Sequence, residues 1–126
     1  MDLTRQHPGD KVYVRKVGAG GITVADATYQ TSLILSPETV DANWPVKTVE
    51  DLSEEALEPL LGLKPEVVLI GTGKAQRFLD PGLTMMFYRN GIGIEVMDTR
   101  AACRTFNILV MEERRVVAAL MPPEAQ

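Results

Sequence analysis

Two short polar stretches carry the residues of this sequence that are best suited to bind a ligand. Gly71 to Lys74 follows the apolar run Val67 to Ile70, and Asp98 to Arg100 follows the predicted strand Ile94 to Met97. Backbone N–H groups at the start of a helix attract anions, and hydroxyl and amide groups hydrogen-bond polar ligands. These residue types predict a site for an anion or a polar metabolite, although the carboxylate of Asp98 disfavours an anion close to it. The candidate ligand-binding residues are Gly71, Thr72, Gly73, Lys74, Gln76, Asp98, Thr99 and Arg104.

The Gly71-Thr72-Gly73 turn does not match a phosphate-binding loop. The Walker pattern requires a glycine where Val68 stands and a serine or threonine where Ala75 stands. We therefore interpret the turn as a tight exit from a strand that uses the freedom of glycine at positive φ, with nucleotide binding as the alternative. Replacing Gly73 with valine is expected to disrupt the turn if its φ is positive.

The chain has few residues suited to nucleophilic catalysis or to binding a metal. Its single cysteine, Cys103, cannot form an intramolecular disulfide, and together with its single histidine, His7, it cannot supply the usual transition-metal cluster. Cys103 is expected to be a buried small apolar residue, with a thiol activated by Arg104 as the alternative. Glu95 and Asp98 could act as an acid–base pair, but we favour Asp98 as a helix cap and Glu95 as the partner of an arginine. No catalytic residue, metal or cofactor is assigned, and whether the protein is an enzyme stays open.

The elements that position these residues form a β-rich first third and an alternating remainder. Short apolar runs bounded by glycine and proline predict the early strands, and Asp98 or Thr99 is expected to cap the last helix. The predicted strands are Val12 to Val17, Ile22 to Val24, Tyr29 to Leu35, Val67 to Ile70, Ile94 to Met97 and Arg115 to Met121. The predicted helices run from Ser53 to Gly62, from Pro81 to Asn90 and from Asp98 to about Glu112.

Two local features have more than one interpretation. Trp44 lies in an irregular stretch from Val40 to Thr48, where a tryptophan either plugs the edge of a core, which we favour, or takes part in binding. Thr105 and Asn107 fall inside the last predicted helix despite their poor helix propensity, which indicates either a buried polar network or a site.

The β-α-β-α-β order from Val67 onward allows helical crossovers, so its three strands should be parallel. We predict a three-layer α/β fold, with a mixed β-sheet flanked by helices and an additional β-hairpin layer. The two polar turns then lie at the carboxyl edge of the sheet, where open α/β sheets bind ligands. The 126 residues are expected to form one domain, with residues 1–10 as a mobile arm and residues 122–126 as a tail.

The composition of the chain limits the kinds of partner it can bind and its expected location in the cell. The net charge of −4 argues against general binding to nucleic acid, and no apolar run reaches the roughly 20 residues that span a membrane. The first residues lack the apolar core of a signal peptide, so a cytoplasmic location is expected.

Three stretches carry a resemblance to a known family: Gly93 to Leu109 (GIEVMDTRAACRTFNIL), Leu69 to Gly73 and Arg115 to Leu120. With these stretches, the chain resembles a small domain family of largely unknown function that includes the mitochondrial complex I assembly factor 3 and bacterial and archaeal stand-alone proteins. The resemblance extends from about Tyr29 to Leu120. It implies a three-layer α/β fold, no presumed enzymatic activity and, as for the mitochondrial relatives, assembly work with other proteins.

Two functions therefore stand as hypotheses. The first is a non-enzymatic protein-binding or assembly accessory domain, linked through the family to respiratory-complex or membrane-protein biogenesis, with protein partners. The second is a small-molecule binder or a weak enzyme that uses the crevice at the carboxyl ends of the parallel strands. The oligomeric state stays open.

Overall fold

The structure, a computed structural model, describes residues 10–126. The arm predicted at residues 1–10 therefore lies outside the described residues, apart from Asp10. The strands are β1 (Val14–Gly18), β2 (Gly21–Val24), β3 (Ala27–Tyr29), β4 (Leu33–Leu35), β5 (Val40–Asp41), β6 (Val67–Gly71), β7 (Gly93–Met97) and β8 (Val116–Leu120). The helices are the 3-10 turn η1 (Val49–Asp51), α1 (Glu54–Gly62), α2 (Pro81–Tyr88) and α3 (Thr99–Met111).

The central sheet is built around β6, whose apolar run is typical of a strand covered on both faces. The strand order is β5-β4-β8-β6-β7. β6 pairs in parallel with β7 and with β8, whereas β4 pairs antiparallel with β8. The predicted parallel strands and mixed sheet are confirmed.

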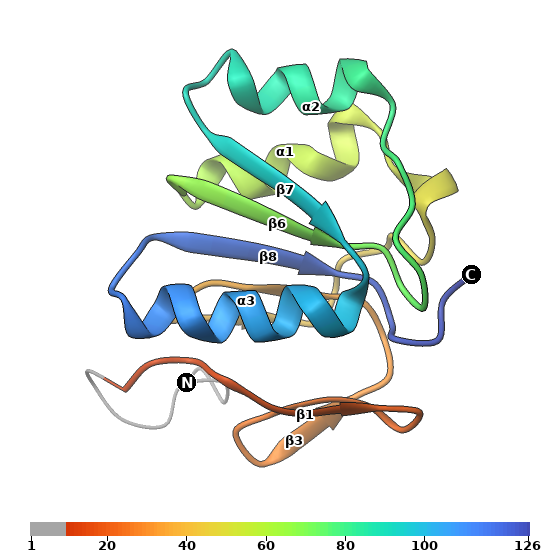
Figure 1. Ribbon diagram of the computed structural model, residues 1–126, viewed down its shortest axis with the longest axis vertical. Helices are drawn as coiled ribbons and strands as arrows, with labels where there is room; N and C mark the ends of the chain where they lie inside the picture. The colour runs from red at the N-terminus through yellow and green to blue at the C-terminus, as the bar shows by residue number, and fades with distance from the viewer. Residues whose placement is uncertain (1–9) are drawn as a thin grey trace.

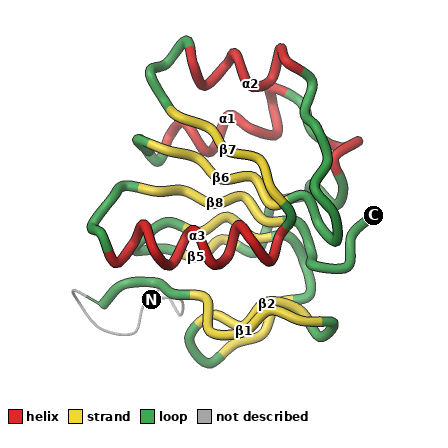
Figure 2. Tube along the Cα trace, in the orientation of Figure 1, coloured by secondary structure: helices red, strands yellow, loops and turns green. Residues whose placement is uncertain are grey.

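Successive residues of β6 point to opposite faces of the sheet and so join two separate cores. Val68 and Ile70 pack in a core with residues of α1 and α2, whereas Leu69 packs in a core with Phe106 of α3. The small sheet β1-β2-β3 lies on the outer side of α3 (Figures 1 and 2). The helices thus flank the central sheet on both faces, and the predicted α/β fold with an additional β-hairpin layer is confirmed.

The small sheet corrects one predicted element. β1 and β2 form the predicted antiparallel hairpin, and β3 adds to β2. The single strand predicted from Tyr29 to Leu35 is wrong, because Tyr29 ends β3 while Leu33–Leu35 forms β4 of the central sheet. Gln30 and Thr31, both exposed, lie where the chain crosses from one sheet to the other.

Side-chain caps begin α1 and α3 at the predicted residues. The Ser53 hydroxyl accepts a hydrogen bond from the Ala56 N–H (3.1 Å), and the Asp98 carboxylate accepts one from the Ala101 N–H (2.9 Å). Each cap satisfies an N–H group that has no partner within the first turn of its helix. Of the two residues considered for the last helix, Asp98 is the cap.

Trp44 packs in the core, as the favoured interpretation of its sequence context predicts. Its side chain is 5% exposed, and its indole Nε1–H donates to the carbonyl of Ala56 in α1 (2.8 Å). The hydrogen bond satisfies the polar atom of a large buried ring, so Trp44 is a rigid part of this region.

Asn107 holds the small sheet to α3. Its Oδ1 accepts the backbone N–H of Val14, and its Nδ2 donates to the backbone carbonyl of the same residue, both at 2.8 Å. The side chain thus occupies the place of a neighbouring strand against Val14. The polar residue in the last helix therefore belongs to a structural network.

We predict that Asn107→Ala lowers the free energy of unfolding by about 1–3 kcal/mol, because both backbone groups of the buried Val14 lose their partner. Urea denaturation followed by circular dichroism measures the change. Arg104→Ala, an exposed position on the same helix, is the control and should shift stability by less than about 0.5 kcal/mol. Equal stability of the two variants would show that the Asn107 contacts contribute nothing.

Candidate functional site

The two polar turns lie side by side at the carboxyl edge of the central sheet. The Thr72 N–H donates to the Met97 carbonyl (2.9 Å), and the Thr99 N–H donates to the Gly73 carbonyl (2.9 Å). The Gly73 N–H in turn donates to the Thr99 hydroxyl (2.8 Å). Parallel pairing of β6 and β7 therefore brings these residues together, as expected from the order of the elements.

The hydroxyl groups between the two turns are occupied by the chain itself. Thr72 and Thr99 are fully buried. The Thr99 hydroxyl donates to the Met121 carbonyl (2.8 Å), and the Thr72 hydroxyl donates to the Ala75 carbonyl (2.7 Å). A buried hydroxyl that already has its partners stabilises the turn that it joins, and here both serve the strand exits.

Residues 122–126, predicted to be a tail, pack over the first turn. The Lys74 N–H donates to the Ala125 carbonyl (2.9 Å), and the guanidinium of Arg77 donates to the Gln126 carbonyl (2.8 Å). Gly73 has φ +102°, and a Cβ at this position would collide with the carbonyl oxygen of Ala125. Glycine is thus required both by the backbone conformation and by the approach of this segment.

The remaining candidate residues lie around this filled centre. Lys74, Gln76 and Arg104 have exposed side chains, and Asp98 is engaged as the cap of α3. Gln76 extends along the outer strand β7 and donates its Nε2–H to the Val96 carbonyl (3.1 Å). The structure therefore gathers Gly71, Thr72, Gly73, Asp98 and Thr99 around the two turns, and a ligand site among the candidates stays a prediction.

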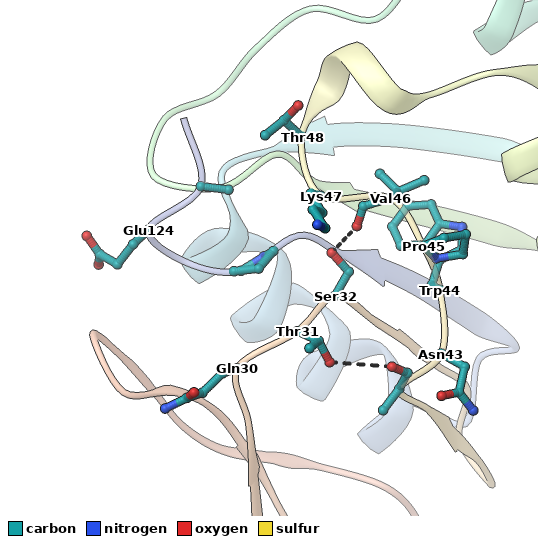
Figure 3. Close-up of a pocket in the computed structure, with 13 residues that line it drawn as sticks. Gln30, Thr31, Ser32, Asn43, Trp44, Pro45, Val46, Lys47, Thr48 and Glu124 are labelled. Atoms are coloured by element: carbon teal, nitrogen blue, oxygen red, sulfur yellow. Dashed lines mark hydrogen bonds between the residues drawn. The ribbon is translucent and has the colours of Figure 1, made fainter.

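A pocket of about 590 Å³ lies beside the two turns, where β8 ends and the chain enters β4 (Figure 3). This volume is typical of small-molecule sites. Its walls come from the crossing before β4, from the irregular stretch before η1 and from the segment after β8. The apolar residues that line it are Ala42, Trp44, Pro45, Val46, Pro122 and Ala125.

Hydrogen bonds to the backbone hold the walls of the pocket in place. The Ser32 hydroxyl donates to the Val46 carbonyl, and the Thr31 hydroxyl donates to the Ala42 carbonyl (3.4 Å). Sequence reasoning missed this pocket, because its walls come from segments far apart in the chain. The one sequence signal was Trp44 in an irregular segment, for which a binding role was the alternative.

The residues considered as a nucleophile and as an acid–base pair, Cys103, Glu95 and Asp98, lie in surroundings that do not activate them for catalysis. Cys103 is buried, and burial raises the pKa of its thiol to about 12, outweighing the opposing effect of Arg104 and Arg100. Glu95 forms no salt bridge within residues 10–126, and Arg100 pairs with Glu124 (3.5 Å), so the expected pairing of Glu95 with an arginine is wrong. In the same range, no three His, Cys, Asp or Glu residues are grouped as metal ligands.

The mixed sheet, the flanking helices and the extra hairpin layer define an α/β domain of the type described as Mth938-like. A solution structure with that description, from Bordetella pertussis, is 32% identical with a TM-score of 0.81, covering 100% of this chain and 95% of that one. A crystal structure of a Bordetella parapertussis protein is 41% identical with a TM-score of 0.84, covering 89% of this chain and 96% of that one.

The chain belongs to the family described as protein of unknown function (DUF498/DUF598), whose model matches residues 14–121. A mouse (Mus musculus) relative, NADH dehydrogenase (ubiquinone) 1 alpha subcomplex assembly factor 3, is 35% identical over 117 residues, which cover 91% of this chain and 63% of the mouse protein. The chain thus spans less than two thirds of the length of that relative. The family resemblance predicted from the sequence is confirmed.

Within residues 10–126, none of the helices has the length and apolar character needed to cross a membrane.

Gly73→Val is predicted to destabilise the protein by at least about 1–3 kcal/mol, because φ +102° is strained for any residue with a Cβ and the side chain collides with Ala125. Thermal and urea unfolding measure the effect. Gly18→Ala is the control, since a Cβ at Gly18 meets no atom within 4 Å. Unchanged melting of Gly73→Val would show that the turn tolerates a side chain.

The thiol of Cys103 is predicted to react with Ellman's reagent at pH 8 only after unfolding, because the buried thiol stays protonated and shielded. The chain has one cysteine, so the absorbance reports this residue alone. Reaction in urea provides the positive control, and an equally fast reaction of the folded protein would contradict the buried environment.

Proposed function

We propose that this chain is a non-enzymatic protein-binding domain that assists the assembly of a larger protein complex. The observation that carries the proposal is the likeness over 91% of the chain to a relative that is named as an assembly factor of NADH dehydrogenase. The proposal extends to this chain the work in that relative's name, with protein subunits as partners. A cytoplasmic location, expected from the sequence, belongs to the same proposal.

An exposed apolar surface on and before α2 supports protein binding. Phe78 is 89% exposed, and Met85 and Tyr88 are also exposed. Met85 and Tyr88 are three residues apart on the face of α2 opposite the buried Met86 and Phe87. Large apolar and aromatic side chains at a surface are a feature of protein contact sites. Figure 1 shows α2 at the outer end of the molecule, where a partner has access to it.

The loop that carries Phe78 is anchored on both sides. The guanidinium of Arg77 forms a salt bridge with Glu50. This contact, together with hydrogen bonds from the backbone and from Thr48, lowers the pKa of the Glu50 carboxyl to about 2. On the other side of Phe78, Leu79 is buried in the core with α1 and α2. Phe78 is thus presented to solvent from a fixed backbone, which lowers the entropy lost when a partner covers it.

A second candidate function is the binding of a small molecule, and one observation favours it. The pocket of about 590 Å³ lies at the carboxyl end of β8, the edge at which α/β sheets bind their ligands. This function would act at a different surface from α2, so a protein partner and a ligand would not compete for the same residues.

Deleting the gene from its host is predicted to lower the amount of assembled NADH dehydrogenase several-fold, as measured on native gels by in-gel activity. The unaltered gene should restore the complex. A double variant, Phe78→Asp with Tyr88→Asp, should fail to restore it, because charges replace the apolar surface that the partner covers.

The matched control is Tyr13→Asp, which changes an exposed aromatic residue that precedes β1 and should restore assembly. Circular dichroism of each purified variant verifies its fold. An undiminished level of the complex in the deletion strain would contradict the assembly function, and restoration by the double variant would contradict the role of the α2 surface.

A further inference from the structure

The pocket beside the two turns has an apolar interior that is fixed before any ligand arrives. Trp44 and Val46 are buried, and hydrogen bonds from Trp44 to Ala56 and from Ser32 to Val46 hold this wall. Pro122 and Ala125 also line the pocket, and Ala125 is held by the N–H of Lys74. A preformed apolar surface of this kind favours a ligand with a hydrocarbon or aromatic body, because little ordering is needed on binding.

Lys47 is the basic residue among those that line the pocket. It forms no salt bridge with any acidic residue in the part of the chain that the structure describes. Asp51, four residues further on, uses its carboxylate to accept the backbone N–H groups of Lys47 and Thr48. The ammonium group of Lys47 is therefore available to a ligand.

Glu124 is the acidic residue that lines the same pocket. Its carboxylate lies 3.5 Å from the guanidinium of Arg100, which offsets its negative charge. Figure 3 shows the Glu124 side chain extending away from Trp44, whereas Lys47 lies near the centre of the residues drawn. The charge that a ligand meets beside the apolar wall is thus positive.

We propose that this pocket binds a small amphipathic monocarboxylate, with its apolar body against Trp44, Val46 and Pro122 and its carboxylate beside Lys47. The inference rests on the second candidate function and names the ligand class for it. A single lysine suits a single negative charge, whereas the polyphosphate of a nucleotide requires several positive groups or backbone N–H donors. The apolar wall is also a poor match for a sugar, whose hydroxyl groups would lose their hydrogen bonds to water.

Trp44 provides a direct readout, because it is the one tryptophan of the chain and it lines the pocket. The full chain is titrated below the micelle concentration with decanoate, with neutral decanol and with cationic decyltrimethylammonium, and Trp44 emission is followed. Decanoate is expected to give a saturable change and to bind roughly two- to fivefold more tightly than decanol, the gain from one exposed ion pair. Decyltrimethylammonium should bind most weakly, and added salt should reduce the advantage of decanoate.

Lys47→Ala should remove the preference for decanoate and leave decanol binding unchanged, and Lys47→Glu should reverse the order of the two charged probes. Lys47 is exposed, so neither variant removes a core contact. Lys16→Ala, an exposed lysine of β1, is the matched control and should behave like the unaltered chain.

Equal affinity for decanoate and decanol, or an unaltered preference in Lys47→Ala, would overturn the carboxylate assignment while leaving the pocket as a small-molecule site. Failure of all three probes to give a saturable change would overturn both the ligand class and the second candidate function. Neither result bears on the assembly of a protein complex, which is measured separately.

Discussion

The hydroxyl group of Thr99 joins three parts of the chain that are distant in sequence. It accepts the N–H of Gly73 after β6 and donates to the carbonyl of Met121 after β8, while Thr99 itself begins α3. The carboxyl ends of the parallel strands are thereby fixed relative to one another. Because the Met121 carbonyl is held there, the position of residues 122–126 is set as well. Pro122 and Ala125 of this segment line the neighbouring pocket.

Much of the framework could be predicted because local rules and global packing agree. Ser53 and Asp98 have the side chains that cap helices, and the run from Val67 to Ile70 has the continuous apolar character of a strand covered on both sides. Long connections between the last three strands imply parallel pairing, which placed the turns at Gly73 and Thr99 at one edge. These inferences need only neighbouring residues and chain direction.

The features that escaped prediction depend on contacts between distant segments. Nothing local to Tyr29 or Leu33 indicates that they belong to different sheets, because the division is decided by pairing with β2 and β8. The filling of the space between the two turns requires the position of Ala125, some fifty residues beyond Gly73 in the chain. The pocket likewise forms only when the stretch around Trp44 meets the segment after β8.

The hydrogen bond from the Gln76 side chain to the outer strand β7 has a consequence for the protein in concentrated solution. β7 is the last strand of the central sheet, and its outward-facing backbone groups are a template on which another chain could add a strand. The side-chain amide of Gln76 occupies the carbonyl of Val96 on that side. One glutamine in the loop before α2 thus opposes edge-to-edge aggregation and helps to keep the sheet finite.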